Sequence, residues 1–345
     1  MSDSPFLSLE LFRKVFSNGL RRLLAAPDLG GYILAHANAA FDEQLLAALH
    51  PELRSSYNQL AKQCREALHA GREVEGAADD TLVFLKLMAI GFDGVQVTRF
   101  RSLDDWELQF NHLRAFRPSR ITSETVSGIR RPFDPAGFHF NKPFLRQEAI
   151  WAGELLGETV ELLYNKFPFV PLHGLLVPDR QAQWPQLLTR RYHDYAWRLC
   201  ETLGEGLPGW GVGYNSYGAH ASVNHLHFQT FVCDTPLPIT RDVWAHQGGA
   251  RPYPLRCEVF TSMEEAWRRI ESLHQVACSY NLIYLPGRLY CLPRRPQGTY
   301  PMADWSSGFA WYEVAGGFTT ANAEAFESLD DATIAWEMAK LNLPV

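Results

Sequence analysis

The feature that most constrains the fold is a change in hydrophobic periodicity near residue 92 of this 345-residue chain. Before that point, stretches such as LELFRKVFSNGLRRLL repeat apolar residues every three to four positions, which is the helical period. After it, short runs such as GVQVTRF and WELQF alternate apolar and polar residues, which favours β-strands. We therefore expect a helical N-terminal region over residues 1–92 and an α+β domain over residues 93–345.

Two later segments indicate an internal repeat. The stretch YNKFPFVPLHGLLVPDR (164–180) and the stretch YNLIYLPGRLYCLPRR (280–295) share a Tyr-Asn opening, a central proline and an apolar run that closes on Pro and Arg. Each lies near one of two segments with helical spacing, WPQLLTRRYHDYAWRLCETLG and SMEEAWRRIESLHQVACSYN. This similarity predicts a duplicated strand-and-helix unit. The alternative is a chance likeness between two strand-turn-strand segments.

Composition excludes several classes of protein. The net charge of −6 at pH 7 does not indicate a nucleic-acid or anionic-membrane partner. The start, MSDSPFLSLELFRKVF, lacks the features of a signal peptide, and the longest apolar stretch, LVFLKLMAIGF, is too short to span a bilayer. The six cysteines are scattered without a Cys-x-x-Cys pair. We expect a cytoplasmic protein without metal or cofactor, and nothing in the sequence indicates its oligomeric state.

The candidate site is the stretch ASVNHLHFQTF, residues 221–231. Successive side chains on a strand alternate between its faces, so His225, His227 and Gln229 would share one face. The alternative is a half-exposed strand whose solvent face carries histidines without a function. A neutral imidazole is a good nucleophile near pH 7, and its attack on phosphorus gives a covalent phosphoramidate. The spacing therefore suggests covalent catalysis at a phosphate.

Neighbouring residues supply what such a reaction needs. The ring of His227 can fold back so that its Nδ1–H meets the carbonyl of His225, which leaves Nε2 free to attack. Gln229 can donate its amide to a phosphoryl oxygen but cannot carry a proton as histidine can. Asn215 and Ser222 are short donors at the strand ends, and the small-residue loop NSYGAHAS lets backbone amides approach phosphate. We interpret the segment as a nucleotidyl-transfer site.

The run NSYGAHASVNHLHFQ resembles the active-site signature of the histidine-triad superfamily, in its transferase branch, where H-x-H-x-Q replaces the H-x-H-x-H of the hydrolases. More narrowly, the chain resembles the GDP-hexose phosphorylases, the family of the plant GDP-L-galactose and animal GDP-D-glucose phosphorylases. Further matching segments, in the expected order, are LQFNHLRAFRP, RRPFDPAGF, FHFNKP, YNKFPFVPLHGLLVP, YNLIYLP and GFAWYEVAGG. The segment YNKFPFVPLHGLLVP is also similar to diadenosine tetraphosphate phosphorylase, so the base stays open.

The resemblance implies a histidine-triad-like fold, in which two duplicated half-units combine around an antiparallel sheet. It implies a ping-pong reaction on a nucleoside diphosphate sugar, with GDP-hexose favoured and inorganic phosphate as the expected acceptor. His227 would carry the nucleoside monophosphate, with His225 and Gln229 as the other catalytic residues. Rival readings are a dinucleoside polyphosphate phosphorylase, which would bind a dinucleotide, and a catalytically silent nucleotide-binding module.

The resemblance also implies substrate-binding residues. Asn215 and Ser222 match phosphate-contacting positions of the hexose-1-phosphate uridylyltransferases, and Lys142 falls on a family lysine that would offset diphosphate charge. Those uridylyltransferases often carry Cys and His metal ligands near their N-terminus, and no such pair exists here.

Other candidates come from the residues themselves. In an arginine-rich stretch, Arg114 and Arg117 are candidates for contact with sugar or phosphate, although such stretches are usually solvated surface. His220 could touch phosphate or a leaving group, or be a loop histidine without a role. His173, before a buried-looking run, is interpreted as structural. Glu313 matches a glutamate of the family, and the resemblance implies that it orders the site; the alternative is a buried acid tied to the backbone.

Overall fold

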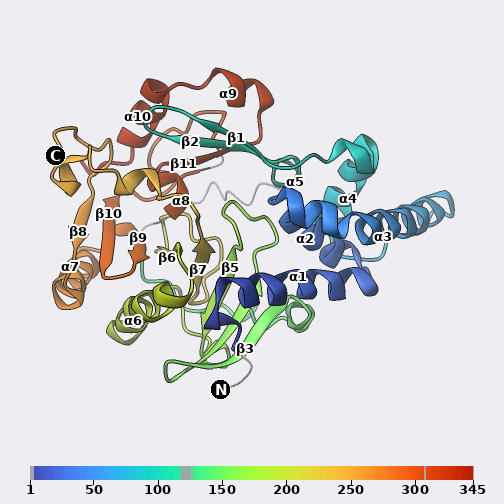
Figure 1. The fold of residues 1–345 in the computed structure, drawn as a ribbon, viewed down its shortest axis with the longest axis horizontal. Coiled ribbons are helices and arrows are strands. Elements are labelled where there is room, and N and C mark those ends of the chain that lie inside the picture. The colour runs from blue at the N-terminus through green and yellow to red at the C-terminus, as the bar shows by residue number, and fades with distance from the viewer. Residues whose placement is uncertain (1–3, 118–125, 127, 307, 345) are drawn as a thin grey trace.

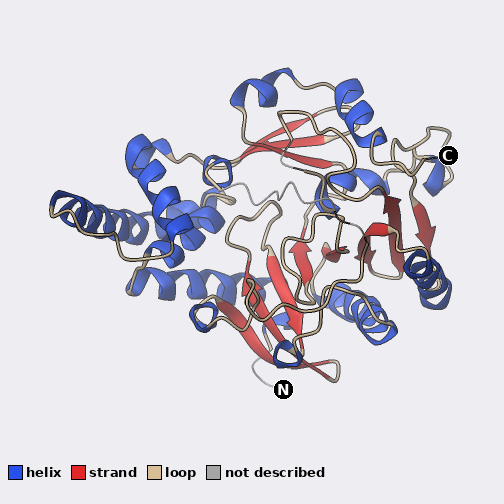
Figure 2. Ribbon diagram, turned by 180° about the vertical axis from the view of Figure 1, so that it is seen from behind, coloured by secondary structure: helices blue, strands red, loops and turns tan. Residues whose placement is uncertain are grey.

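The computed structural model describes residues 4–117, 126, 128–306 and 308–344 (Figure 1). A group of N-terminal helices, a large antiparallel sheet and a small three-stranded sheet surround the middle of the molecule (Figure 2). The α+β class and the helical N-terminal region expected from the sequence are confirmed. The N-terminal helices are α1 (Leu9–Ala25), α2 (Leu29–Ala39), α3 (Glu43–His69) and α4 (Ala78–Ile90).

These helices begin where the sequence places capping side chains. Ser8, Asp28 and Asp42 each accept a hydrogen bond from the backbone N–H three residues further on. The buried face of α1 then packs on the large sheet, where the ring of Phe12 lies edge-on to Trp210 at 5.9 Å. The helices thus share a hydrophobic core with the sheet, and the division of the chain at residue 92 stays a prediction.

The large sheet has eight strands, each antiparallel to its neighbours, in the order β3-β4-β5-β7-β6-β9-β10-β8. Short runs of alternating or apolar residues form these strands, as expected from the sequence. Their bounds are β3 (Ala149–Leu155), β4 (Glu158–Tyr164), β5 (Gly174–Pro178), β6 (Trp210–Asn215), β7 (Phe228–Val232), β8 (Glu258–Phe260), β9 (Ser279–Leu285) and β10 (Arg288–Arg294).

The topology repeats about the central β6–β9 pair. The first half-unit runs β5-α6-β6-β7 and the second runs β8-α7-β9-β10, where α6 is Arg190–Gly206 and α7 is Met263–Gln275. Their strand orders, β5-β7-β6 and β9-β10-β8, mirror one another in the sheet. The predicted duplication is therefore present, but the paired segments were wrong. The segment 164–180, which runs from the last residue of β4 through β5, was equated with β9–β10. In the structure β9–β10 corresponds to β6–β7, and β5 corresponds to β8.

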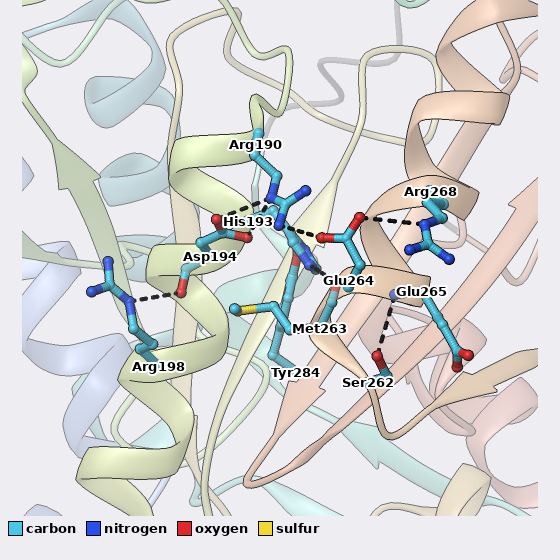
Figure 3. Close-up of polar contacts among 10 residues, drawn as sticks. All are labelled: Arg190, His193, Asp194, Arg198, Ser262, Met263, Glu264, Glu265, Arg268 and Tyr284. Atoms are coloured by element: carbon cyan, nitrogen blue, oxygen red, sulfur yellow. Dashed lines mark hydrogen bonds and ion pairs between the residues drawn. The ribbon is translucent and has the colours of Figure 1, made fainter.

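Helices α6 and α7 lie side by side on one face of the sheet (Figure 3). Arg190 of α6 donates to Glu264 of α7 at 2.5 Å and also pairs with Asp194 one turn along its own helix. Below them, the buried ring of His193 joins the Tyr284 hydroxyl of β9, at 2.9 Å, to the carbonyl of Met263, at 3.0 Å. The two half-units are thus connected through their helices as well as through β6 and β9.

The other face of the sheet carries the small sheet. Its strands are β1 (Arg99–Ser102), β2 (Glu107–Phe110) and β11 (Gly317–Thr320), followed by helices α9 (Ala323–Ser328) and α10 (Asp331–Ala339). Helix α8 (Trp311–Val314) lies between the two sheets, and the ring of Trp311 stacks on Phe231 of β7 at 4.7 Å. Gly213 makes this contact possible, because a Cβ there would fall 2.3 Å from the indole.

Among the described residues, no helix combines the length and the apolar character needed to cross a bilayer.

Candidate functional site

A cavity of about 1590 Å³ lies where the three parts of the molecule meet. Its lining comes from the large sheet, from α8 and β11, and from the N-terminal helices, including α4. The predicted site residues that line it are Arg114, Arg117, Asn215, His220, Ser222, His227, Gln229 and Glu313. Two predicted residues, His225 and Lys142, are not among the lining residues.

The strand expected over residues 221–231 begins only at Phe228. Before Phe228, the side chain of Gln186, rather than a neighbouring strand, bonds to the backbone. Gln186 accepts the N–H of His227 at 2.9 Å and donates to the carbonyl of His227 at 3.1 Å. The same amide donates to the carbonyl of Asn215 at 2.9 Å, at the end of β6. Gln186 is 1% exposed, so this clamp holds the backbone of His227 inside the protein.

The ring of His227 is held in one tautomer. Its Nδ1–H donates to the carbonyl of His225 at 2.8 Å, which is the hydrogen bond expected from the sequence. Nε2 then carries no proton in the neutral ring and makes no hydrogen bond with a described residue. Burial lowers the pKa of His227 to about 4, so the ring is neutral at pH 7. Because His227 also lines the cavity, its bare nitrogen is available to a ligand.

His225 is buried and, unlike His227, is not among the residues that line the cavity. The chain bends before the strand starts. The Nδ1 atom of His225 accepts the N–H of Phe140 at 3.2 Å, and its ring packs against Phe133 and Phe140. The side chain is 1% exposed. The Phe140 ring also packs against His227, at 5.1 Å, so one aromatic ring contacts both histidines. The shared face stays a prediction, and the carbonyl of His225 is the group that holds the ring of His227.

Gln229 presents an amide donor to the cavity. Its Oε1 accepts the indole N–H of Trp311 at 3.0 Å and lies 3.0 Å from Nε2 of His173. Nδ1 of His173 accepts the N–H of Phe169 at 3.3 Å, so Nε2 carries the proton and donates to Gln229. Because Oε1 already accepts two hydrogen bonds, the NH₂ group of Gln229 is left to donate to a ligand. His173 is fully buried, in keeping with a structural role.

Asn215 has a similar arrangement. Its Oδ1 accepts the N–H of Trp311 at 2.8 Å and the amide of Asn281 at 2.7 Å, which fixes the orientation of the side chain. Its Nδ2 is buried and has no hydrogen-bond partner in the part of the chain that the structure describes. A buried amide without an acceptor costs about 1–3 kcal/mol, so a phosphoryl oxygen would be well placed to satisfy it.

His220 is held in an unusual backbone conformation next to these donors. Its φ of 65° lies in the left-handed region, which is rare for a residue with a Cβ. Its N–H donates to Gln297 at 2.9 Å, and its ring contacts the hydroxyl of Tyr300 at 3.4 Å. Burial lowers the pKa of His220 to about 3, so this ring is also neutral at pH 7. Ser222, further along the loop, is exposed at the cavity wall.

Cationic groups lie at the same end of the cavity. Arg114 donates to the carbonyl of Phe167 at 2.9 Å, and its guanidinium lies 4.7 Å from the ring centre of Phe169. Burial lowers the pKa of Arg114 and raises that of Glu313, and each charge partly offsets the burial of the other. Glu313 accepts from the N–H of Ala310 and the hydroxyl of Thr319, at 2.9 and 3.0 Å. Arg117 lies over the ring of Phe167.

The residues that the sequence did not single out are Gln186 and Trp311. Gln186 reaches His227 from 41 positions earlier in the chain, and no local pattern marks it. Trp311 belongs to the segment GFAWYEVAGG, but its hydrogen bonds to Asn215 and Gln229 depend on how α8 packs on the sheet. Within the described ranges, no three His, Cys, Asp or Glu side chains are grouped as a metal site requires.

Comparison with known proteins gives a family model and several relatives that match part of the chain. Residues 105–231 match the family model for the GDPGP1-like N-terminal domain. Human GDP-D-glucose phosphorylase 1 is 34% identical over 135 residues, which cover 35% of this chain and 32% of the relative. GDP-L-galactose phosphorylase 1 of Arabidopsis thaliana is 27% identical over 177 residues, which cover 42% of this chain and 39% of the relative. The chain thus aligns with about a third of each of these proteins.

Yeast Ap4A phosphorylase Apa2 is a similar solved structure, with a TM-score of 0.49 and 17% identity, covering 78% of this chain and 96% of that one. The resemblance to the GDP-hexose phosphorylases is confirmed over residues 105–231.

Proposed function

We propose that this chain, whose residues 105–231 match the GDP-hexose phosphorylase family, is a nucleotidyltransferase that phosphorolyses a nucleoside diphosphate sugar, with GDP-hexose favoured. The observation that carries the proposal is the ring of His227. It is neutral, fixed in one tautomer by the carbonyl of His225, and presents a bare Nε2 to a large cavity. A binding module would not require a nucleophile prepared in this way.

In the first step, Nε2 of His227 attacks the α-phosphorus of the sugar nucleotide. A P–N bond forms, the bond between that phosphorus and the bridging oxygen breaks, and hexose 1-phosphate leaves with the bridging oxygen. In the second step, an oxygen of inorganic phosphate attacks the same phosphorus, the P–N bond breaks, and the nucleoside diphosphate is released. The histidine is restored, so phosphate rather than water is the final acceptor.

The donors around His227 would stabilise the charge that develops on the non-bridging oxygens. The NH₂ groups of Gln229 and Asn215 make no hydrogen bond with a described residue, and both residues line the cavity. Donors already fixed in place need no reorganisation during the reaction. Arg114 and Arg117, which also line the cavity, add positive charge. Gln229 has no proton to shuttle, which disfavours activation of water and favours transfer.

His225 is proposed to position His227 rather than to touch the substrate, since its ring is buried away from the cavity. His220 and Ser222 are proposed to contact the phosphate groups from the loop before the nucleophile. Lys142, which lies outside the cavity wall, would have to reach the substrate from its rim.

A substrate screen tests this function. GDP-glucose, ADP-glucose and diadenosine tetraphosphate are incubated with the protein in the presence and absence of inorganic phosphate, and products are separated by chromatography. We expect phosphate-dependent release of GDP from GDP-glucose, with parallel initial-rate lines that indicate a ping-pong reaction. No phosphate-dependent turnover of any of the three substrates would contradict the proposal. Release of the monophosphate at a rate independent of phosphate would indicate a hydrolase instead.

A further inference from the structure

The cavity extends well beyond the phosphate donors, along one row of the large sheet. Gln229 of β7 is the register partner of Leu175 of β5, which in turn pairs with Leu163 of β4. Leu163 pairs with Ala149, at the start of β3. Register partners share a face of the sheet, and adjacent strands lie about 4.8 Å apart, so this row spans about 14 Å. His227 lies at one end of the row and Glu148 at the other.

The floor between these ends is apolar. Leu163 packs with Phe140, Leu145 and Val223 in one buried cluster, and Leu175 packs against it. All of these side chains also line the cavity. An apolar floor with a few polar groups at its ends is typical of a site for a flat, partly apolar ligand such as a nucleobase.

Glu148 at the far end is a buried acid whose carboxylate makes no hydrogen bond with a described residue. It is 6% exposed and lines the cavity, and its own backbone carbonyl accepts the N–H of Tyr164 at 3.0 Å. The polar groups nearest to it are already engaged. Lys166 pairs with Asp80 at 2.7 Å, and Gln147 donates to Asp28 at 2.8 Å. Because it lines the cavity without a donor from a described residue, this carboxylate can accept hydrogen bonds from a ligand.

We propose that Glu148 recognises the base of the nucleotide and selects guanine. This inference rests on the proposed function, because it assumes that the phosphorus of the nucleotide lies at His227. A carboxylate offers two acceptor oxygens, which complement the N1–H and 2-amino donors of guanine in a bidentate pair. Adenine presents an unprotonated ring nitrogen at the same position, which the carboxylate would repel. The apolar floor contacts the purine ring, and the carboxylate of Glu148 accepts hydrogen bonds from the edge of the ring.

The same geometry gives the N-terminal helices a part in the site. Asp28 is the N-cap of α2 and Asp80 lies in the first turn of α4, and both line the cavity next to Glu148. Through Gln147 and Lys166 they fix the residues on either side of the carboxylate. We infer that the helical region completes the base end of the cavity, while the sheet supplies the phosphate end.

Binding of nucleoside monophosphates tests this inference without turnover. Affinities of the full chain for GMP, IMP, XMP and AMP are measured by calorimetry at pH 8, where Glu148 is ionised because burial raises its pKa only to about 7. We expect GMP to bind at least about tenfold more tightly than AMP, since a good bidentate pair discriminates by about that factor or more. IMP, without the 2-amino group, should bind less tightly than GMP. XMP, with a carbonyl oxygen at that position, should bind more weakly than IMP.

The variant Glu148→Gln replaces one acceptor with a donor, so AMP should bind more tightly than GMP. Its amide can accept from the 6-amino group of adenine and donate to the ring nitrogen. The matched control Glu154→Gln, on the exposed side of β3, should leave the order unchanged. If Glu148→Gln does not fold, the wild-type ranking of GMP, IMP and XMP still decides the matter. Equal affinities for these three nucleotides would overturn the inference.

An unchanged ratio of the affinities for GMP and AMP in folded Glu148→Gln would also overturn the inference. The two proposals can fail separately. Failure of the proposed function appears as the lack of phosphate-dependent turnover, whichever base is offered. If only this inference fails, the protein turns over its substrate, but Glu148→Gln shows the same preference among bases as the wild type.

Discussion

The two half-units of the large sheet share a topology and differ in the connection between their last two strands. In the first, β6 and β7 are joined by residues 216–227, which carry His220, Ser222, His225 and His227. In the second, Pro286 and Gly287 alone join β9 to β10, and Gly287 takes the positive φ of 67° that a tight turn requires. The proposed catalytic residues therefore lie in a long connection that the second half-unit replaces with a two-residue turn.

The second half contributes to the site through the seam between β6 and β9. Asn281 of β9 donates to Asn215 of β6 at 2.7 Å and accepts from the buried Arg294 of β10 at 3.2 Å. This contact, with the N–H of Trp311, fixes the orientation of the Asn215 amide. The comparison teaches that one copy of the repeat carries the proposed nucleophile, while the other orients the side chain of Asn215, which lines the same cavity.

The largest expected effect follows from removal of the nucleophile. His227→Asn should lower kcat/KM for phosphorolysis by at least about 1000-fold, because no other group can form the covalent intermediate. The matched change in the second half, Arg288→Ala at the β9–β10 turn, should leave kcat/KM unchanged, since Arg288 is exposed and outside the cavity. Steady-state rates of both variants check this. A comparable loss in the two would remove the distinction between the halves.

A smaller effect is expected when the clamp on the nucleophile is released. Gln186→Leu keeps the approximate volume but loses all three hydrogen bonds, so His227 should lose its orientation. Misplacement of a reacting group by about 1 Å can cost about 100-fold, and we expect a loss of that order in kcat with little change in KM. The exposed Gln181→Leu is the control. A rise in KM at constant kcat would instead mean that Gln186 binds substrate.

The seam between the halves should show a still smaller effect on turnover. Asn281→Ala removes the donor that orients Asn215 and leaves Arg294 without one acceptor. We expect kcat to fall by about tenfold and the free energy of unfolding by about 1–3 kcal/mol, the cost of unsatisfied buried groups. Chemical denaturation and initial rates measure the two quantities. A variant with full activity would show that the second half does not support the site.

The least effect on turnover is expected at His274, a buried histidine of the second half. Burial lowers its pKa to about 4, as it does for His227. A histidine that is neutral when folded contributes stability above its unfolded pKa of about 6.5, and this is lost as the pH falls through about 4. As the pH is lowered from 7 to 4, the free energy of unfolding of the wild type should therefore fall by up to about 3 kcal/mol more than that of His274→Gln. Rates at pH 7 should not change, which denaturation curves and assays at each pH can establish.

The sequence was sufficient to predict the change from helices to sheet near residue 92 and the hydrogen bond between His227 and the carbonyl of His225, because both depend on local periodicity and spacing. It placed the start of the strand too early, because a strand forms only where a ladder exists, and Gln186 replaces the ladder before Phe228. The clamp by Gln186 and the unpartnered carboxylate of Glu148 arise from contacts between segments far apart in the chain. No periodicity within a single segment encodes such contacts.

The most direct test of the central claim is to locate the nucleotide on the protein. The full chain is incubated with GDP-glucose without phosphate, digested at neutral to alkaline pH to preserve a phosphoramidate, and mapped by peptide mass spectrometry. The account predicts one added nucleoside monophosphate on the peptide that contains His227, which is lost when phosphate is added and does not form in His227→Asn. An adduct on another residue, or turnover with no adduct on any peptide, would contradict it.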